Sequence, residues 1–492
     1  MRLFSGPQMS TNNSGDSKIF DAVVVGNGTL GLSLGLELAR RGVQVAVLGK
    51  ASRPFAASAV AGAMNGCFGE ATPGLLQSEH GRTKLAMDVR ATALWNDWEQ
   101  SIIEASDERV IRSAEGTIII LNTIGVPEID TAGYASIRAA LDEYDEPYED
   151  LDPDQIDWLA PEPTSRPMKA MFIPNEHAVD SAALLRGLAT AFVRAGGTLI
   201  DEQAVEVLVD NGRATGVVLE STDVVSAPSV VLAAGVASGD LLGCLPPDVR
   251  ARIPAIVSGY GVALLLETED STAPDHVIRT PNRAFACGLH VVPRGDGTIY
   301  LGATNNISTQ PRTSARIDDL NLLLGSTRQM RSDLVEGAVH RIMVGNRPVP
   351  LDGFPLLGEV GIDGLWMMTG TYRDGLHQSP LIAKDFAARL LGEEHDTTLD
   401  VFTPVRKPIQ ALSRQDCLET AVRHTLALGY EQDWGIPVDW PPLIEEQLRG
   451  MFQRSLDELH PTFVPPAELL AFDDPEITAA LSAYYRAHDE AS

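Results

Sequence analysis

The sequence predicts an α/β fold (α+β overall) with a parallel-sheet domain, an antiparallel-sheet domain and a helical C-terminal extension. Three observations lead to this prediction. A glycine-rich segment around residue 26 separates a short apolar run from an amphipathic one, which is typical of a strand–turn–helix unit. Residues 255–266 and 285–304 alternate as antiparallel strands do. After about residue 400, prolines and helical stretches predominate.

The strand–turn–helix unit has the pattern of a Rossmann-like dinucleotide-binding turn. Residues 21–25 are apolar and rich in β-branched side chains, which indicates a buried parallel strand. Gly26, Gly28 and Gly31 then form G-x-G-x-x-G, and residues 30–41 continue as a helix. The first glycine permits a tight turn, the second lets the backbone approach a pyrophosphate, and the third lets the helix pack closely on the strand. The helix would direct its free N–H groups at the phosphates.

The context of this motif both supports and limits the interpretation. A glycine-rich turn without a ligand has the same pattern, but here a second strand at residues 43–48 completes the expected unit. The end of that strand usually carries an acidic residue that binds a ribose hydroxyl. This position holds Gly49, followed by Lys50. The ribose must be held in another way, so the choice between NAD and FAD rests on the rest of the chain.

Three later segments are expected to reach the same nucleotide. Residues 52–69 are rich in Gly and Ala, which fits either close approach to a flat ligand or a flexible surface loop. Residues 229–235 form an apolar strand that ends in small residues, where a doubly wound sheet again meets a nucleotide. Residues 367–392 read MMTGTYRDGLHQSPLIAKDFAARLLG and indicate a second helix that starts at a flavin. The spacing of the first and last segments is typical of FAD-dependent oxidases and dehydrogenases.

The composition excludes several classes of partner. The chain has 492 residues, a net charge of −29 and a pI of about 4.6, which disfavours nucleic acid and anionic membranes as partners. Four widely spaced cysteines favour reduced thiols in a cytoplasmic protein over a disulfide framework. The sequence has no run long enough to span a bilayer and no metal-ligand spacing. Residues 1–17 are polar, so we expect a disordered leader and not a signal peptide.

The order of the expected elements predicts a discontinuous nucleotide-binding domain. This domain is assigned residues 18–100, 165–250 and 340–398. A mainly antiparallel substrate domain is assigned residues 101–164 and 251–339, and a helical extension residues 399–492. Two of the expected elements are a single helix over 83–101 and a single strand over 198–209.

Six segments together resemble the D-amino-acid oxidase superfamily, and most closely its glycine oxidase and sarcosine oxidase subgroup. The resemblance covers residues 18–395, while Gly49 and the extension depart from the usual pattern. The segments are VVVGNGTLGLSLGLELARRG (23–42), ASAVAGAM (57–64), VVLAAGVAS (230–238), HVVPRGDGTIYLGAT (290–304), VGNRPVPLDGFPLLG (344–358) and TGTYRDGLHQSP (369–380).

The resemblance implies FAD-dependent oxidation of the C–N bond of an amino acid or an N-substituted glycine. In this reaction a hydride passes from Cα to flavin N5, water hydrolyses the resulting imine, and O2 reoxidises the flavin to give H2O2. An amine dehydrogenase with a non-oxygen acceptor is the first alternative. The second is a flavoprotein whose extension docks a carrier or partner protein. A homo-oligomer is compatible with either.

The resemblance also assigns roles to two arginines. Arg347, in GNRP, matches the arginine that holds the substrate carboxylate, a role that suits the planar fork of a guanidinium. The alternative is a structural arginine that fastens the proline-rich loop. Arg373, in TYRDG, is expected beside the flavin ring, where its charge and the N–H groups of Asp374 and Gly375 would stabilise the reduced anionic flavin. The alternative is a salt bridge to Asp374 or another acid.

Residues of the predicted roof over the flavin complete the expected site. His290 is expected to contact substrate or to stabilise charge during reoxidation, and the alternative is a hydrogen-bonded core histidine. Tyr260 is expected to face the same pocket. Residues 255–304 contain no lysine, so the lysine route to oxygen activation of sarcosine oxidases is absent. The spacing around Cys67 does not match a covalent attachment pattern, so FAD is expected to be non-covalent.

The expected FAD contacts come from both ends of the matched region. They are Gly26, Gly28, Thr29, Leu30, Gly31, Lys50, Ser58, Ala61, Gly62, Ala63, Met64, Val205, Ala234, Gly235, Arg347, Tyr372, Arg373, Asp374, Gly375, Leu376 and His377.

The extension carries Trp434, Trp440, Phe452 and Phe463, side chains that are costly to leave in water. We therefore expect it to fold back on the catalytic body and to line or cover the substrate entrance. Such a cover would suit a larger or more specialised amine, such as an N-carboxymethyl amino acid of a biosynthetic pathway. The alternative is that the extension builds a subunit interface or stabilises the fold.

Overall fold

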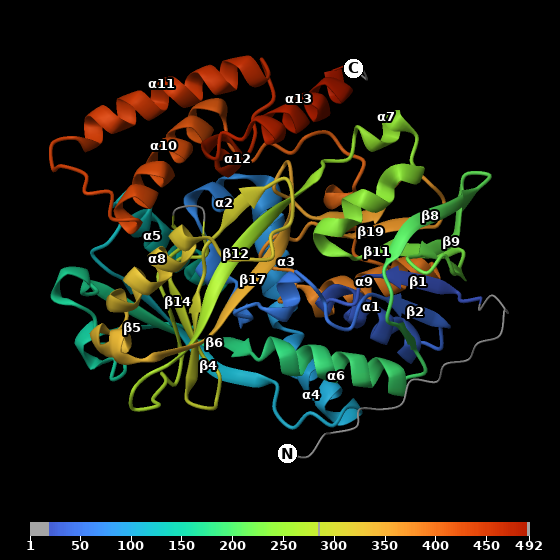
Figure 1. Cartoon of the computed structure of the whole chain (residues 1–492), viewed down its shortest axis with the longest axis horizontal. Helices are drawn as coiled ribbons and strands as arrows, with labels where there is room; N and C mark the ends of the chain where they lie inside the picture. Colours follow the sequence, from blue (N-terminus) through green and yellow to red (C-terminus); the bar gives the residue numbers. More distant parts are fainter. Residues whose placement is uncertain (1–18, 284–285, 490–492) are drawn as a thin grey trace.

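The computed structural model describes residues 19–283 and 286–489. The leader expected at residues 1–17 lies outside these described residues. The described chain contains two large sheets with helices around them, and a layer of helices from the C-terminal end, drawn in orange and red, lies along one side (Figure 1).

The first sheet is the parallel sheet of the nucleotide-binding domain. Its strands run in the order β18-β19-β11-β1-β2-β7, and only β18 pairs antiparallel with its neighbour. The strand bounds are β1 (Ala22–Val25), β2 (Val45–Leu48), β7 (Thr198–Ile200), β11 (Ser229–Leu232), β18 (Leu356–Glu359) and β19 (Leu365–Thr369).

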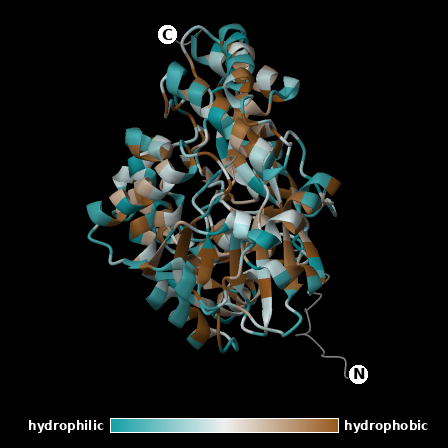
Figure 2. Ribbon diagram, turned by 90° about the vertical axis from the view of Figure 1, so that its left-hand side faces the viewer, coloured by the Kyte–Doolittle hydropathy of each residue, from teal (hydrophilic) through white to brown (hydrophobic). Residues whose placement is uncertain are grey.

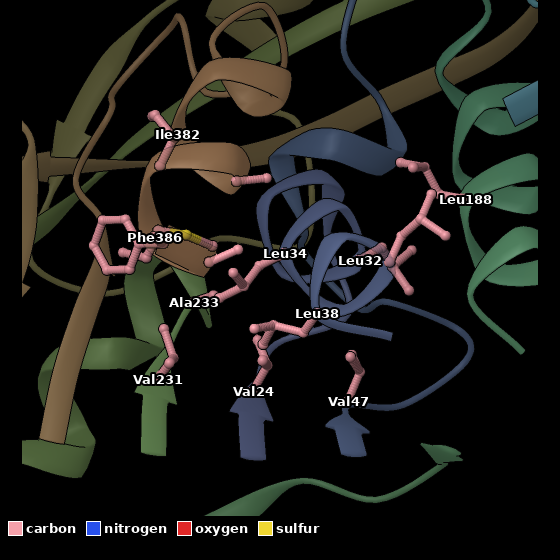
Figure 3. Packing of buried hydrophobic residues seen from close by; sticks show 14 of the residues in the cluster. Val24, Leu32, Leu34, Leu38, Val47, Leu188, Val231, Ala233, Ile382 and Phe386 are labelled. Atoms are coloured by element: carbon pink, nitrogen blue, oxygen red, sulfur yellow. The ribbon is translucent and has the colours of Figure 1, made fainter. Parts of the chain in front are cut away.

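Both faces of this sheet are covered, which explains why its strands are apolar throughout. On one face, Val24, Val47 and Val231 pack against Leu34 and Phe386 from the helices (Figure 3). The other face carries a small antiparallel sheet. The covering helices are α1 (Thr29–Arg40), α6 (Ser181–Arg194) and α9 (Ser379–Leu391), and the small sheet comprises β8 (Ala204–Asp210), β9 (Arg213–Leu219) and β10 (Val224–Ser226).

The second large sheet forms the roof of the site described below. Its strand order is β16-β12-β15-β14-β13-β4-β6-β3, with β17 paired to β12 and β5 paired to β6. The strand bounds are β3 (Met64–Asn65), β4 (Arg112–Leu121), β5 (Glu149–Leu151), β6 (Lys169–Val179), β12 (Ile256–Glu267), β13 (Val277–Arg279), β14 (His290–Pro293), β15 (Thr298–Gly302), β16 (Asn306–Ser308) and β17 (Ala338–Pro350).

Several elements differ from the sequence-based expectation. β6 and β17 belong to the second sheet, although residues 165–250 and 340–398 are assigned above to the nucleotide-binding domain. The single helix expected over 83–101 is two helices that meet at residues 93–94, and the strand expected over 198–209 is β7 in one sheet and β8 in another. Apolar periodicity marks a buried face but does not state which sheet buries it. The remaining helices of this region are α2 (Pro73–Gln77), α3 (Glu79–Thr92), α4 (Trp95–Ala105), α5 (Asp130–Glu143), α7 (Pro247–Arg250) and α8 (Ile317–Ser326).

The C-terminal module, residues 413–489, is a helical unit with its own apolar core. The core of the nucleotide-binding domain includes Leu399, Phe402 and Ile409, so the module begins later than the expected residue 399. Polar residues dominate its outer helices, as Figure 2 shows by colour, with Phe452 buried inside. The helices are α10 (Arg414–Glu431), α11 (Pro441–Leu459), α12 (Ala467–Ala471) and α13 (Pro475–Asp489).

The module folds back on the catalytic body, as expected. Ile477 and Tyr485 share one apolar cluster with Val257 and Val349 of the roof strands β12 and β17. The expectation that the module's aromatic residues are packed is wrong for two of them, because Trp434 is 51% exposed and Trp440 is 55% exposed. Trp434 lies in the turn that follows α10, and Trp440 directly precedes α11.

No helix within residues 19–283 and 286–489 combines the length and the apolar character needed to cross a membrane.

Candidate active site

A cavity of about 580 Å³ lies between the parallel sheet and the roof sheet. Its walls come from the turn after β1, residues 53–64, the end of β11, the roof strands and the turn before α9. This volume falls within the range of small-molecule and cofactor sites. Segments that lie far apart in the sequence therefore meet at one site.

The turn after β1 has the backbone that its glycines predict. Gly26 adopts φ +123°, and a Cβ atom there would lie 2.2 Å from the carbonyl oxygen of Ala233. A Cβ atom on Gly31 would lie 1.8 Å from the carbonyl oxygen of Gly26. Only glycine fits at either position, so α1 can start directly at the cavity.

The start of α1 fits a pyrophosphate. No side chain caps the helix at Gly28, and the hydroxyl of Thr29 is buried without a hydrogen-bond partner among the described residues. The backbone N–H of Thr29 donates to Ser58 Oγ at 3.2 Å. The helix dipole and the unpaired hydroxyl of Thr29 make this helix start suitable for an anion.

The end of β2 is organised around Asn27 in place of an acidic residue. Gly49 has φ +153°, and a Cβ atom there would lie 2.7 Å from Asn27 Cγ. Asn27 Nδ2 donates to the carbonyls of Gly49 at 2.9 Å and Lys50 at 3.0 Å. Arg53 Nε donates to the carbonyl of Asn27 at 2.8 Å, and Arg53 also lines the cavity. A larger residue at position 49 is therefore excluded by both space and backbone conformation.

Most of the expected site residues share this cavity. Two do not line it: Gly31, which is internal to the turn, and Tyr260. The lining includes Gly26, Gly28, Thr29, Leu30, Lys50, Ser58, Ala61, Gly62, Ala63, Met64, Val205, Ala234, Gly235, His290, Arg347, Tyr372, Arg373, Asp374, Gly375, Leu376 and His377.

Tyr260 points away from the cavity, contrary to the expectation. Its hydroxyl donates to Asp319 Oδ2 of α8 at 3.3 Å, and its ring belongs to the apolar core beneath that helix. Side chains alternate along β12, so its neighbours Gly259 and Gly261 are on the opposite face. β12 is buried on both faces along most of its length, so its sequence does not show which of its side chains face the cavity.

Arg347 projects into the cavity from β17. A Cβ atom on Gly261 would lie 2.4 Å from Arg347 Nη1, so the glycine makes room for the guanidinium. Nη1 donates to the carbonyls of Gly259 at 3.4 Å and Thr304 at 3.3 Å and to Asn305 Oδ1 at 3.0 Å. Arg347 makes no ion pair within the described chain, and Nε and Nη2 make no hydrogen bond there. The guanidinium is thus fixed through one nitrogen and available to a carboxylate through the other two.

Arg373 is partly paired with a buried acid. Its Nε lies 3.7 Å from Glu70 Oε2, while Arg279 Nη1 lies 3.1 Å from Glu70 Oε1. Burial alone would raise the pKa of Glu70, but Arg279, Arg373 and Asn282 together lower it to about 2. Glu70 is therefore ionised and lies between two guanidinium groups. Asp374, the partner considered above, pairs with Lys84 instead.

His290, the first residue of the roof strand β14, is buried and uncharged. Burial and the nearby Arg279 lower the pKa of His290 to about 3, so the ring is neutral at physiological pH. Its Nδ1 lies 3.1 Å from the carbonyl oxygen of Gly288, which assigns the proton to Nδ1. Nε2 faces Gly62, where a Cβ atom would approach it to 3.3 Å. A neutral ring does not fit the expected stabilisation of charge during reoxidation, whereas contact with substrate remains compatible.

Sequence reasoning missed several residues of the cavity. Glu70, Arg279 and Cys287 line it, and Tyr300 stacks on His290 with ring centroids 5.7 Å apart. One signal was present: Arg279 lies in an apolar strand, where a buried arginine requires a paired acid. The pairing with Glu70, more than two hundred residues earlier, has no sequence signature.

Comparison with known proteins identifies the family. A family model described as FAD dependent oxidoreductase matches residues 21–389, about three quarters of the chain, and the chain belongs to this family. FAD is therefore its cofactor. The C-terminal module lies outside the matched residues.

Similar curated proteins include a bifunctional protein ThiO/ThiG from Nostoc sp., 26% identical over 400 residues, which are 80% of this chain and 56% of that protein. A glycine oxidase from Pseudomonas putida is 30% identical over 229 residues, 46% of this chain and 59% of that protein. The chain thus matches little more than half the length of these two relatives. A glycine oxidase from Geobacillus kaustophilus is 28% identical over 74% of this chain and 90% of its own length.

Solved structures share the fold. A glycine oxidase structure from Geobacillus kaustophilus has a TM-score of 0.68 at 22% identity and covers 79% of this chain and 99% of that chain. An iminodiacetate oxidase from Chelativorans sp. has a TM-score of 0.66 at 17% identity and covers 78% of this chain and 98% of that chain.

Proposed function

We propose that this chain oxidises the C–N bond of an amino acid or an N-substituted glycine, with FAD as hydride acceptor and O2 as final oxidant. The products are an imine, which water hydrolyses to a carbonyl compound and an amine, and H2O2. The names of the similar proteins, glycine oxidase and iminodiacetate oxidase, support this class of substrate.

The observation that carries the proposal is the state of Arg347. Its guanidinium lies in the cofactor cavity, is held through Nη1, and makes no ion pair within the described chain. A charge in such a place is costly unless a ligand of opposite sign binds there. A substrate carboxylate satisfies this need with two charge-assisted hydrogen bonds.

The remaining cavity residues bind and orient the reactants. The start of α1, with Gly28, Thr29 and Ser58, would hold the pyrophosphate, and the residues before α9 would lie at the flavin end. When bound, FAD supplies the acceptor for a hydride from the substrate Cα. His290 is neutral, so its Nε2 lone pair can accept an N–H from the substrate amine without repelling it.

Anaerobic mixing with a panel of amino acids and N-substituted glycines tests the proposal. A substrate should bleach the visible flavin absorbance of the wild-type protein, and readmitted air should restore the colour with release of H2O2. If bleaching occurs but colour returns only with an artificial electron acceptor, the dehydrogenase alternative replaces the oxidase. A protein that no member of the panel bleaches would contradict amine oxidation.

An exposed apolar patch on the C-terminal module favours a second role, docking of a partner protein or a second copy of the chain. Trp434, Val438, Trp440 and Leu443 are each more than half exposed. Such a patch on a soluble protein commonly marks an interaction site. Light scattering on the wild type and on a Trp434→Ser/Trp440→Ser variant tests the homo-oligomer, because loss of apolar contact should shift the mass toward the monomer.

We propose a cytoplasmic location and no nucleic-acid or membrane partner. All four cysteines are free thiols, and the net charge is −29. Free thiols suit a reducing compartment. The negative net charge disfavours binding to polyanionic surfaces such as nucleic acids and anionic membranes.

A further inference from the structure

The C-terminal module contributes one charged side chain to the layer behind the substrate pocket. Glu468 lies in α12 (Ala467–Ala471), which packs on one side against the module core and on the other against the roof strands. None of the described residues of the module lines the cavity, so the module does not line the site, and its role as a cover over the substrate entrance stays a prediction. Its influence on the site must pass through residues that do.

A continuous hydrogen-bond network leads from Glu468 to the cavity. Glu468 Oε1 accepts hydrogen bonds from the Tyr372 hydroxyl and from Asn305 Nδ2, each at 2.5 Å. Asn305 Oδ1 in turn accepts from Arg347 Nη1 at 3.0 Å. Asn305 Nδ2 and the Tyr372 hydroxyl are also in direct contact with each other. Two of these residues, Tyr372 and Arg347, line the cavity.

This network fixes both the amide plane of Asn305 and the side chain of Tyr372. Because Glu468 is acceptor-only when ionised, it forces Asn305 to present Nδ2 to the module and Oδ1 to Arg347. With the opposite orientation, an amide N–H would face the guanidinium and repel it. The backbone of Tyr372 has φ +52°, a conformation that a non-glycine residue holds only when its surroundings fix it.

We propose that Glu468 is a positioning residue for substrate binding: through Asn305 and Tyr372 it holds Arg347 in its carboxylate-binding orientation. This inference rests on the proposed function, since it assigns to Arg347 the substrate carboxylate. It gives the C-terminal module, which the family match does not cover, a direct part in the affinity of the site.

The direction in which anion affinity changes when Glu468 is removed distinguishes a positioning role of Glu468 from a purely electrostatic effect of its charge. Burial raises the pKa of Glu468, and the nearby guanidinium groups of Arg373 and Arg347 oppose that rise, so the carboxyl group lies within electrostatic reach of both arginines. If Glu468 acted only through its charge, removing it would strengthen the binding of an anion at Arg347. If Glu468 orients Arg347, removing it weakens that binding.

The test uses the full-length FAD-loaded protein and acetate as a carboxylate probe, with binding followed by the perturbation of the flavin spectrum. Glu468→Leu should raise the Kd for acetate about tenfold, as expected for the loss of one well-aligned charged contact. Glu468→Gln keeps an acceptor oxygen for Tyr372 and Asn305 and should bind acetate as tightly as the wild type or more tightly. For a turned-over amine, Glu468→Leu should raise KM and change kcat less than about twofold.

Glu476→Leu is the matched control. Glu476 also joins the module to the catalytic body, since it accepts from Thr309 Oγ1 at 2.6 Å, but neither residue lines the cavity. This variant should leave the Kd for acetate unchanged. Asn305→Ser interrupts the same network from the body side, so it should weaken acetate binding even if Glu468→Leu does not fold.

Two outcomes would overturn the inference in distinguishable ways. If acetate binds the wild type, Glu468→Leu and Asn305→Ser with equal Kd while only the melting temperature falls, Glu468 is structural and the proposed function stands. If acetate perturbs the flavin spectrum of neither the wild type nor Arg347→Ala, Arg347 does not bind a carboxylate. Both the carboxylate clamp and the positioning role of Glu468 are then wrong.

Discussion

Arg279 on a roof strand and Glu70, which follows the small-residue segment, form a buried ion pair of 3.1 Å at the edge of the cofactor cavity. Arg279 is 1% exposed, and its other donors bind Asn282 Oδ1 and the carbonyl of Cys287. The same carboxylate also approaches Arg373. Arg279 is therefore fully engaged and Arg373 partly so, and Arg53 lies at the turn after β1, so among the four arginines of the cavity Arg347 is the guanidinium best placed to receive a substrate carboxylate.

The first prediction concerns cofactor attachment. The purified protein should be yellow, and acid precipitation should release all FAD into the supernatant. Cys67 is buried and forms a weak contact with Thr92 Oγ1 at 3.6 Å, and burial raises the pKa of its thiol, so little reactive thiolate is present. Absorbance of pellet and supernatant decides the matter, and flavin that stays with the denatured polypeptide would show a covalent bond.

Arg347→Ala should lower kcat/KM for amino-acid substrates, because a charge-assisted bidentate contact is lost. The decrease should correspond to a loss of about 2–4 kcal/mol of transition-state stabilisation. Arg347→Lys should recover only part, since an ammonium lacks the planar fork. Arg341→Ala is the control, as Arg341 is an exposed arginine of the same strand. Steady-state kinetics on folded, FAD-loaded variants measure the effect, and an unchanged kcat/KM in Arg347→Ala would dismiss the clamp.

His290 should not contribute a break to the pH profile of the enzyme. The pKa of His290 is lowered to about 3 by burial and by Arg279, so the ring stays neutral from pH 6 to 9. His290→Asn should therefore change the level of log kcat/KM without changing the shape of its pH dependence over this range. A break between pH 6 and 7 that disappears in the variant would mean that His290 titrates during catalysis.

Glu176 should make the protein less stable as the pH rises. Burial raises the pKa of Glu176 to about 7, above the usual 4.5, so the folded state holds the proton more tightly than the unfolded state. The stabilisation is complete below pH 4.5 and is lost as the pH rises through about 7, in total about 3 kcal/mol. Glu176→Gln should flatten the melting temperature between pH 5 and 8.

The control for this measurement is Glu458→Gln, which changes an exposed glutamate of α11. Its pH dependence should match that of the wild type. If Glu176→Gln retains the full wild-type slope, the buried carboxyl of Glu176 is not the source of the pH dependence.

The residues at the cofactor end of the cavity can be predicted from the sequence more readily than those at the substrate end. Gly26 and Gly31 are required by backbone geometry and close packing, and such requirements are local and leave a pattern. The same holds for the small residues 233–235 that follow β11. The pairing of Glu70 with Arg279, by contrast, joins segments that no local rule connects.

The errors have equally physical causes. The expectation that Tyr260 faces the pocket is wrong because a strand buried on both faces, such as β12, shows no alternation of polar and apolar residues that would identify the side facing the pocket. The exposure of Trp434 and Trp440 escaped prediction because aromatic content indicates burial only on average. The contact of Glu468 with Tyr372 depends on how a module outside the family match docks on the body, which the sequence does not state.

If the cavity oxidises an amine whose carboxylate binds Arg347, anaerobic reduction of the bound flavin must depend on that carboxylate. Stopped-flow absorbance of the wild type mixed with amino acids and N-substituted glycines should show at least one compound that bleaches the flavin within seconds. The corresponding amine without a carboxylate should be far slower, and Arg347→Ala should remove the difference. Equal bleaching with and without the carboxylate, or no bleaching by any compound, would contradict the account.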